Sequence, residues 1–225
     1  MTEEVEKGQQ LSGKVAYVST LGFSPEPVVL GLMYVFRHEE ELDKVVVLYG
    51  GPRSKKPAGE PIGREVTPPP PIERQAQGGP VHIPPSEGAA SICRVVSGRG
   101  IACEMIPIMH IENLRDTLKQ TWDVLKKLYR DGFRKFWLNY TTGTRVMSVA
   151  LVTAGVSLAQ QTAELISEKR GELSEEELAG LEVEIQSIYV LPKFDQRGRP
   201  VPGGETIHTF RLVPLSLPRQ AMNGE

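Results

Sequence analysis

Short runs of β-branched and apolar residues alternate along the chain with longer segments whose apolar residues have helical spacing. The runs predict four strands: Val15–Ser19, Lys44–Tyr49, Cys103–Ile108 and Lys135–Asn139. The longer segments predict four helices: Pro27–Phe36, Ser86–Ser97, Asn113–Tyr129 and Thr144 to about Glu168. In the third helix, leucine and tryptophan recur every three or four positions, which is the period of one helix face. The fourth is apolar nearly all round at its start, which predicts a place deep in the core.

This alternation predicts right-handed crossovers and a mainly parallel sheet with helices on both faces. Near the C-terminus the pattern changes to two strand-like runs, Val183–Leu191 and Thr206–Pro214, joined by the Gly- and Pro-rich segment Pro192–Gly204. These two runs predict a closing β-hairpin whose strands are antiparallel. We therefore expect one α/β, Rossmann-like domain over residues 1–225, with a flexible tail at 215–225.

The segment Gly50–Pro85 interrupts this order, because it holds ten of the 18 prolines, among them Pro68–Pro71. Neither a helix nor a central strand tolerates such a composition, so we expect a Pro/Gly-rich insertion over residues 50–85. The simpler interpretation is a solvated insertion without a catalytic role. The alternative is a lid that closes over a ligand and adds positive charge from its lysines and arginines.

Composition and charge narrow the class of partner. Hydrophobic residues are 40% and charged residues 24% of the chain, as in ordinary soluble proteins. A net charge of −2 argues against a broad basic surface for duplex nucleic acid, whereas a small anionic ligand needs only a local positive site. The longest apolar stretch, Val146–Ala159, is shorter than the about 20 residues of a membrane span.

The N-terminus and the cysteines indicate a cytoplasmic protein. Met1–Gln10 is acidic and polar, unlike a signal peptide. Cys93 and Cys103 lack a C-x-x-C spacing, so we expect neither a disulfide framework nor a zinc site. Neither the histidines nor the acidic runs have metal-site spacing, and Glu39–Glu41 and Glu175–Glu177 are expected to be solvated helix surfaces.

Two segments have the form of a strand, a turn of small residues and a helix: Ser19–Ser24 and Asn139–Arg145. In open α/β sheets, ligands bind beyond the carboxyl ends of strands where the strand order reverses. Both turns combine hydroxyl groups with a glycine, and the helix that follows adds about half a positive charge at its N-terminus. Arg145 adds a permanent charge and a planar fork that suits phosphate oxygens. The sequence therefore predicts a phosphate site shared by both loops.

A purely structural interpretation exists for either loop alone, since Thr142 or Thr144 could cap a helix while Gly143 permits the turn. Two such loops at matching strand ends favour a shared ligand. The common nucleotide motifs are absent from the sequence: there is no G-x-x-x-x-G-K-[ST] segment, and Gly98–Gly100 precedes a predicted strand instead of following one. This argues against a conventional ATPase or NAD enzyme.

Taken together, Thr20-Leu-Gly-Phe-Ser-Pro-Glu-Pro-Val28 and Asn139-Tyr-Thr-Thr-Gly-Thr-Arg-Val-Met147 resemble the two signature loops of the CRISPR-associated Rossmann-fold (CARF) family. The resemblance spans roughly Lys14–Pro214 and implies a homodimer that binds cyclic tetra- or hexa-adenylate across its two-fold axis. Many relatives have two glycines and a lysine in the second loop, where this chain has Thr-Gly and Arg145. Arg145 keeps the positive charge at this position, but a catalytic mechanism that depends on the lysine would lack that residue here.

The resemblance implies a ligand site formed by both loops and their flanks. The expected ligand-binding residues are Ser19, Thr20, Leu21, Gly22, Phe23, Ser24, Asn139, Thr141, Thr142, Gly143, Thr144, Arg145, Met147 and His110. The loops would hold phosphates and riboses. The adenines would occupy apolar or aromatic pockets, for which Leu21, Phe23, Met147 and Tyr140 are candidates, although Phe23 and Met147 could equally be core residues.

The resemblance also implies a stand-alone ring nuclease, because the 215–225 tail is too short to fold as an effector. A ribose 2′-OH would attack its adjacent phosphorus without a metal or cofactor. Arg145 would stabilise the developing charge, and Ser24 or Thr20 would orient the 2′-OH or the leaving oxygen. Three alternatives stay open: a non-catalytic sensor that regulates an effector or transcription partner, a DNA-binding regulator whose reader domain lies elsewhere in the full-length gene, and an unrelated Rossmann-like nucleotide enzyme.

Overall fold

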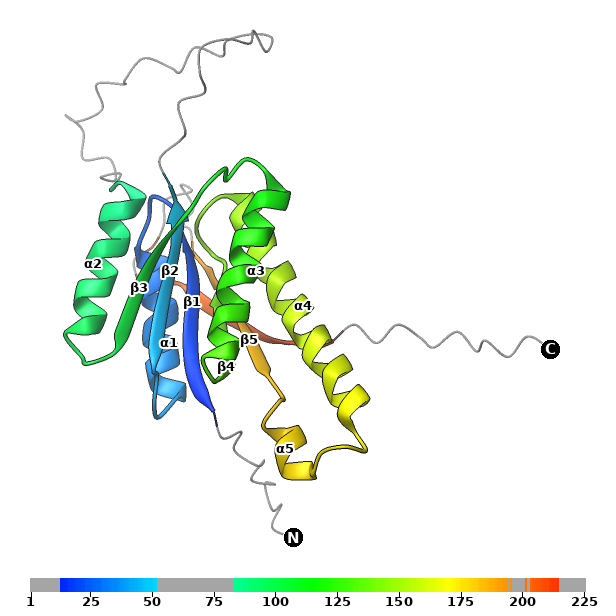
Figure 1. Cartoon of the computed structure of the whole chain (residues 1–225). Helices are drawn as coiled ribbons and strands as arrows, with labels where there is room; N and C mark the ends of the chain where they lie inside the picture. Colours follow the sequence, from blue (N-terminus) through cyan, green and yellow to red (C-terminus); the bar gives the residue numbers. More distant parts are fainter. Residues whose placement is uncertain (1–12, 52–82, 194, 196–200, 202, 215–225) are drawn as a thin grey trace, which may run out of the picture.

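The central element of the structure, a computed structural model, is a six-stranded sheet in the order β3-β2-β1-β4-β5-β6 (Figure 1). The structure describes residues 13–51, 83–193, 195, 201 and 203–214. The strands are β1 (Lys14–Leu21), β2 (Lys44–Gly50), β3 (Ala102–Ile108), β4 (Phe133–Asn139), β5 (Glu184–Leu191) and β6 (Thr206–Leu212). The helices are α1 (Glu26–His38), α2 (Pro85–Ser97), α3 (Leu114–Arg130), α4 (Arg145–Lys169) and α5 (Glu175–Ala179).

The strand order reverses between β1 and β4. β1 pairs in parallel with β2 on one side and with β4 on the other, and the parallel pairing continues outward to β3 and β5. β6 closes the sheet antiparallel to β5, with Ile185 opposite Leu212 and Leu191 opposite Thr206. This confirms the predicted Rossmann-like, mainly parallel sheet with a C-terminal hairpin. In such a sheet the crevice for a ligand lies at the reversal, here at the carboxyl ends of β1 and β4.

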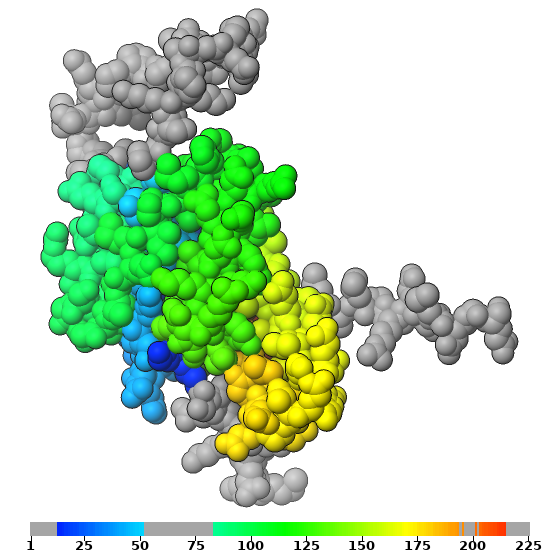
Figure 2. All heavy atoms as spheres, in the orientation of Figure 1, coloured from blue at the N-terminus to red at the C-terminus, as the bar shows by residue number. Residues whose placement is uncertain are grey.

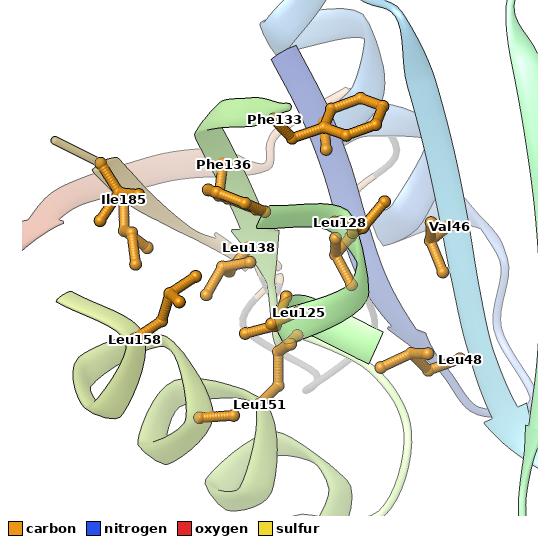
Figure 3. Close-up of a cluster of buried hydrophobic side chains, with 14 of the residues drawn as sticks. Val46, Leu48, Leu125, Leu128, Phe133, Phe136, Leu138, Leu151, Leu158 and Ile185 are labelled. Atoms are coloured by element: carbon orange, nitrogen blue, oxygen red, sulfur yellow. The ribbon is translucent and has the colours of Figure 1, made fainter. Parts of the chain in front are cut away.

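Each face of the sheet carries its own hydrophobic cluster, because successive side chains of a strand point to opposite faces. α1 and α2 cover one face, where Val45 and Val47 are fully buried. α3 and α4 cover the other, where Val46, Leu138 and Leu151 are fully buried (Figure 3). Figure 2 shows α3, in green, beside the yellow residues of α4 on this second face. Helices on both faces are therefore confirmed.

The helix α4 is apolar around most of its circumference, as its sequence predicts. Among the described residues it is the one helix whose length and composition would suit a membrane span. Met147, Leu151 and Leu158 are at most 2% exposed and belong to the cluster between α4 and the sheet. One apolar side of α4 therefore belongs to the hydrophobic core, which confirms the predicted position of this helix.

All four predicted helices and six predicted strands form close to their predicted bounds, whereas α5 was not predicted as a separate helix. α5 begins with a capping box, in which the Ser174 hydroxyl accepts from the Glu177 N–H and the Glu177 carboxylate accepts from the Ser174 N–H. The hydrogen bonds from Ser174 hold the pKa of the Glu177 carboxyl below its usual value. Most of the predicted 50–85 insertion, its proposed role as a lid, and the 215–225 tail lie outside the described residues.

The prediction that Glu39 belongs to a solvated helix surface is wrong. α1 ends at His38, and the Glu39 side chain, only 10% exposed, turns toward the beginning of β4. Its Oε1 atom accepts a hydrogen bond of 2.8 Å from Trp137 Nε1 and lies 2.8 Å from Lys135 Nζ. A run of glutamates in the sequence does not reveal that one of them has a cation and an indole N–H to bind, because both partners come from a distant strand.

The prediction that the two cysteines supply no disulfide framework is also wrong, because Cys93 of α2 and Cys103 of β3 form a disulfide. The ten residues of separation cover the last turn of α2 and the reversal into the adjacent strand, which brings their Cα atoms to 5.3 Å. The C-x-x-C test misses this geometry, since it addresses only pairs within one turn. The cysteine pattern therefore no longer indicates a reducing compartment.

Removing this disulfide is expected to lower the free energy of unfolding. A loop of about ten residues gives roughly 2–3 kcal/mol through the lost constraint on the unfolded chain. Urea denaturation of Cys93→Ser/Cys103→Ser against the wild type measures the difference. Dithiothreitol should lower the wild type to the level of the double variant and leave that variant unchanged. Equal stability of the oxidised wild type and the double variant would contradict a bond between these cysteines.

Candidate functional site

The two predicted loops lie side by side at the strand-order reversal. β1 ends at Leu21 and β4 ends at Asn139, and Ser19 is the register partner of Asn139 in their parallel pairing. Both loops therefore leave the same edge of the sheet from neighbouring strands and lead into α1 and α4. The structure brings together the segments that the sequence pointed to.

Two reciprocal hydrogen bonds hold these loops against each other. The Thr20 hydroxyl donates to the carbonyl of Thr142, and the Thr142 hydroxyl donates to the carbonyl of Thr20. The backbones also touch, since a Cβ on Gly22 would lie 2.9 Å from the backbone nitrogen of Gly143. Gly143 has φ of 93°, and a Cβ there would lie 3.0 Å from Thr20 Cβ. We call this contact the loop interlock; glycine is needed on both sides of it.

Asn139 fixes the beginning of the second loop through the hydrogen bonds of its side chain. Its side chain is completely buried; Nδ2 donates to the Tyr17 hydroxyl at 2.8 Å and to the Pro27 carbonyl at 3.0 Å. Its Oδ1 atom accepts from the Thr141 N–H at 3.0 Å. The Tyr17 hydroxyl in turn donates to the Val28 carbonyl at 2.8 Å, and burial raises its pKa far above the usual value. Asn139 thus ties the second loop to the start of α1.

Tyr17→Phe is expected to destabilise the fold by about 1–3 kcal/mol, because it removes a buried hydroxyl that both donates and accepts. Urea denaturation measures the loss. Tyr129→Phe is the matched control, since the Tyr129 hydroxyl makes one longer, partly buried hydrogen bond of 3.3 Å to the Leu181 carbonyl. A loss at Tyr17 no larger than the loss at Tyr129 would show that the Tyr17–Asn139 bonds add nothing to stability.

The start of α4 presents positive charge at the second loop. Thr144 caps the helix, its hydroxyl accepting from the Met147 N–H at 3.2 Å, as the structural interpretation of this threonine foresaw. The N–H groups of Arg145 and Val146 precede the first intrahelical bond and have no acceptor among the described residues. Arg145 is exposed, and no described carboxylate or carbonyl contacts its guanidinium. These are donors that an anion would satisfy.

A groove of about 600 Å³ opens beside this helix start. It lies between the first turns of α4 and the carboxyl ends of β4 and β5. Tyr140 and Tyr189 stack within it, with ring centroids 5.6 Å apart and planes 24° apart. Burial, and to a lesser extent the neighbouring Tyr189, raises the pKa of the Tyr140 hydroxyl. The lining residues are Tyr140, Thr141, Gly143, Arg145, Ser148, Val149, Val152, Thr153 and Tyr189.

The predicted site residues divide by burial. Five have side chains at most 1% exposed, namely Ser19, Thr20, Leu21, Asn139 and Met147. The others at the two loops are exposed or half-buried, namely Gly22, Phe23, Ser24, Thr141, Thr142, Gly143, Thr144 and Arg145. The buried group shapes and supports the loops, so only the second group has surface to offer a ligand.

His110 is not brought to the loops. It follows β3 at the edge of the sheet, and β2 separates β3 from β1. Its backbone has a φ of 56°, its side chain is half-exposed, and its Nδ1 lies 3.9 Å from Glu112 Oε1. Within the described part of the chain, no hydrogen bond or ion pair joins His110 to either loop.

Sequence reasoning missed the far wall of the groove. Tyr189 lies in a predicted strand, but Ile188 and Val190 on either side of it face the opposite, α1-covered side of the sheet. That alternation is the signal that could have placed Tyr189 on the same face as α4. Among the residues that the structure describes, no aspartate, glutamate or histidine lines the groove and no cluster of metal-ligating side chains occurs.

The sheet order and the interlocked loops define a Rossmann-like α/β domain with a candidate anion site at the strand-order reversal. No protein-family model and no curated protein matches the chain. Among solved structures, protein VC1899 from Vibrio cholerae is similar, with a TM-score of 0.44 and 9% identity over 77% of this chain and 30% of that one. Csm6 of Enterococcus italicus, bound to cyclic hexa-2′-fluoro-hexa-dAMP, is similar with a TM-score of 0.39 and 10% identity over 84% of this chain and 36% of that one. This chain thus spans about a third of each, and a likeness at this level assigns it no function.

Proposed function

We propose that this protein is a stand-alone CARF protein that binds cyclic oligoadenylate, in the first place cyclic tetra-adenylate, and cleaves it as a metal-independent ring nuclease. One observation carries the proposal. The loops that resemble the two CARF signatures, 122 positions apart at Thr20 and Thr142, interlock at the strand-order reversal beside the exposed Arg145. A role in type III CRISPR antiviral defence and a cytoplasmic location belong to the same proposal.

A homodimer is part of the proposal, because a ring with an even number of nucleotides meets equal halves when each loop is present twice. The surface of α4 supports it. No charged residue occurs between Arg145 and Glu164, and the outward-facing Val149 is 51% exposed. An uncharged helix face that continues from the groove suits a second copy, which would also bring a second Arg145 toward the ligand.

The cleavage needs no group beyond the ligand and the loops. The 2′-oxygen of a ribose attacks its adjacent phosphorus while the bond from phosphorus to the 5′-oxygen breaks. The products are a 2′,3′-cyclic phosphate and a free 5′-hydroxyl, and the proton lost from the 2′-OH ends on that 5′-oxygen. Alignment of attacking and leaving oxygens supplies several kcal/mol of such a barrier, as an order of magnitude.

The proposal gives each of the three expected catalytic residues a different role, according to its exposure. Arg145 is free to approach phosphoryl oxygens and stabilise their developing charge, for which one preorganised donor contributes about 3 kcal/mol. Ser24 is exposed at the first loop and would orient the 2′-OH or the leaving oxygen. Thr20, 1% exposed and engaged by Thr142, acts in this proposal by holding the loops in register.

A non-catalytic sensor is the second candidate, and one observation favours it. The described lining of the groove offers no side chain that serves as a general base near neutral pH. An arginine stays protonated and so cannot take the proton from the 2′-OH. Cleavage would then depend on positioning and charge stabilisation alone, which predicts a slow reaction or none.

Incubation of the purified protein with cyclic tetra- and hexa-adenylate in EDTA separates the two candidates, with products resolved by chromatography and mass. Linear di-adenylate with a 2′,3′-cyclic phosphate establishes a metal-independent ring nuclease. Intact ligand bound at one ring per dimer establishes the sensor. Failure of both rings to bind would overturn the proposed function.

A further inference from the structure

From the groove between α4 and the ends of β4 and β5, we infer a purine-base site in which Tyr189 provides the stacking surface. The inference adds Tyr189 of β5, which lies outside both signature loops, to a groove whose lining includes Tyr140 and Arg145 of the second loop. It deepens the proposed function, on which it rests only for naming adenine as the base. Its ligand class, a purine nucleotide, follows from the chemistry of the groove's two walls and its charged end.

The first wall is aromatic and open. Tyr140 and Tyr189 are stacked on each other, and both remain half-exposed at the groove. No described residue bonds to either phenolic hydroxyl, whereas the buried Tyr17 hydroxyl is bonded on both sides. Two adjacent tyrosine rings with an accessible face and free hydroxyls are a platform for a flat heteroaromatic ring.

The opposite wall is aliphatic. Val149 and Val152 of α4 lie one turn apart on the same side of the helix, and Thr153 adds a hydroxyl next to them. Val149 is 51% exposed, so the wall is apolar surface in contact with water. A planar base between Tyr189 and these valines would remove both surfaces from water, and the larger ring system of a purine covers more of them than a pyrimidine.

The charged end of the groove fixes the direction of the ligand. Arg145 and the unpaired N–H groups at the start of α4 lie at one end, and Val152 lies two turns further along, roughly 10 Å away. A nucleotide has this polarity, with phosphate at one end and base at the other. A simple phosphate would use only the Arg145 end, and an aliphatic chain would leave the hydroxyls of Thr153 and both tyrosines without partners.

β6 contributes a further polar group beside the platform. His208 is the register partner of Tyr189 in the antiparallel pairing, so the two side chains lie on the same face of the sheet. His208 is exposed. As the cross-strand partner of Tyr189, it is placed to contact the edge of a base stacked on that ring.

Tyrosine-ring NMR tests the site with adenosine 5′-monophosphate as the probe and ribose 5-phosphate as its base-free control. The chain has six tyrosines, so Tyr17, Tyr34, Tyr49 and Tyr129 serve as internal references in the same spectrum. We expect saturable ring-current shifts of the Tyr140 and Tyr189 signals with the nucleotide and none of comparable size with the sugar phosphate. Unmoved Tyr140 and Tyr189 signals at saturating nucleotide would overturn the base site.

Affinity for cyclic tetra-adenylate separates this inference from the proposed function. Tyr189→Ala should weaken binding by roughly 5- to 150-fold, the range for one stacked base, and Tyr189→Phe should weaken it less. Val95→Ala, at an exposed position on α2, is the control. If the wild type binds the ring and Tyr189→Ala binds it equally well, the base site is wrong while the proposed function stands. If neither protein binds the ring but the nucleotide still shifts the signals of both tyrosines, the base site stands and the proposed function is wrong.

Discussion

Arg145→Ala is expected to slow cleavage of cyclic tetra-adenylate by about 100-fold or more in single-turnover experiments, the usual loss for one preorganised donor to a developing anion. The guanidinium is exposed at the start of α4 and has no competing acceptor among the described residues. Its full charge is therefore available to the phosphoryl group. Arg145→Lys keeps the charge without the fork, so its rate should lie between those of the wild type and the alanine variant.

Arg130→Ala is the matched control for this effect. Arg130 is also an exposed arginine, so its removal changes the net charge by the same amount as the removal of Arg145. It lies in the last turn of α3, at the opposite end of the sheet from Arg145. Arg130→Ala should cleave and bind cyclic tetra-adenylate as the wild type does. If the protein is a sensor, Arg145→Ala should raise the Kd for the intact ring instead. A variant that binds and cleaves like the wild type would exclude Arg145 from the ligand site.

Gly143→Ala should cost more than backbone strain alone, because it also acts on the loop interlock. An alanine at φ of 93° costs about 1–2 kcal/mol for its left-handed conformation. Its Cβ would additionally lie 3.0 Å from Thr20 Cβ, so the first loop must shift away from the second. We expect a lower free energy of unfolding together with at least a tenfold loss of affinity for cyclic tetra-adenylate, because alignment of donors tolerates little displacement.

Gly132→Ala is the control that introduces the same backbone strain without a contact to another loop. Gly132 has a similar φ of 90°, but nothing lies within 4 Å of the Cβ it would gain, and it precedes β4 at the far end of the sheet. This variant should lose stability to urea without losing affinity. Equal stability losses and unchanged affinity at both positions would mean that the interlock does not position the ligand loops.

The sheet and its reversal point could be predicted from sequence because they depend on local patterns. The run Lys44–Tyr49 has the β-branched composition of a buried strand, and the segment after Asn139 has the turn and helix of a ligand loop. Each of these signals lies within a few residues. The alternation of strands and helices then restricts the topology to very few arrangements.

The burial of individual polar residues could not be predicted in the same way. Thr20 and Asn139 look like surface donors in the sequence, yet their partners are a carbonyl 122 positions away and the hydroxyl of Tyr17. The disulfide between Cys93 and Cys103 and the ion pair of Glu39 depend equally on the close approach of separate elements. Pattern reasoning brought the two loops together at one edge of the sheet but did not show which of their side chains are buried.

The pairing of β1 with β4 can form only late in synthesis, because the two strands are far apart in the sequence. Thr20 and Thr142 are 122 positions apart, so at about 5–20 residues per second the second loop emerges roughly 6–24 s after the first. During this interval β1 can pair with β2, and β2 with β3, while the edge of β1 that later pairs with β4 stays open on a growing chain. An unpaired apolar edge is a template for association with other chains. We therefore expect this edge of β1 to be the place where an incomplete chain associates with other chains.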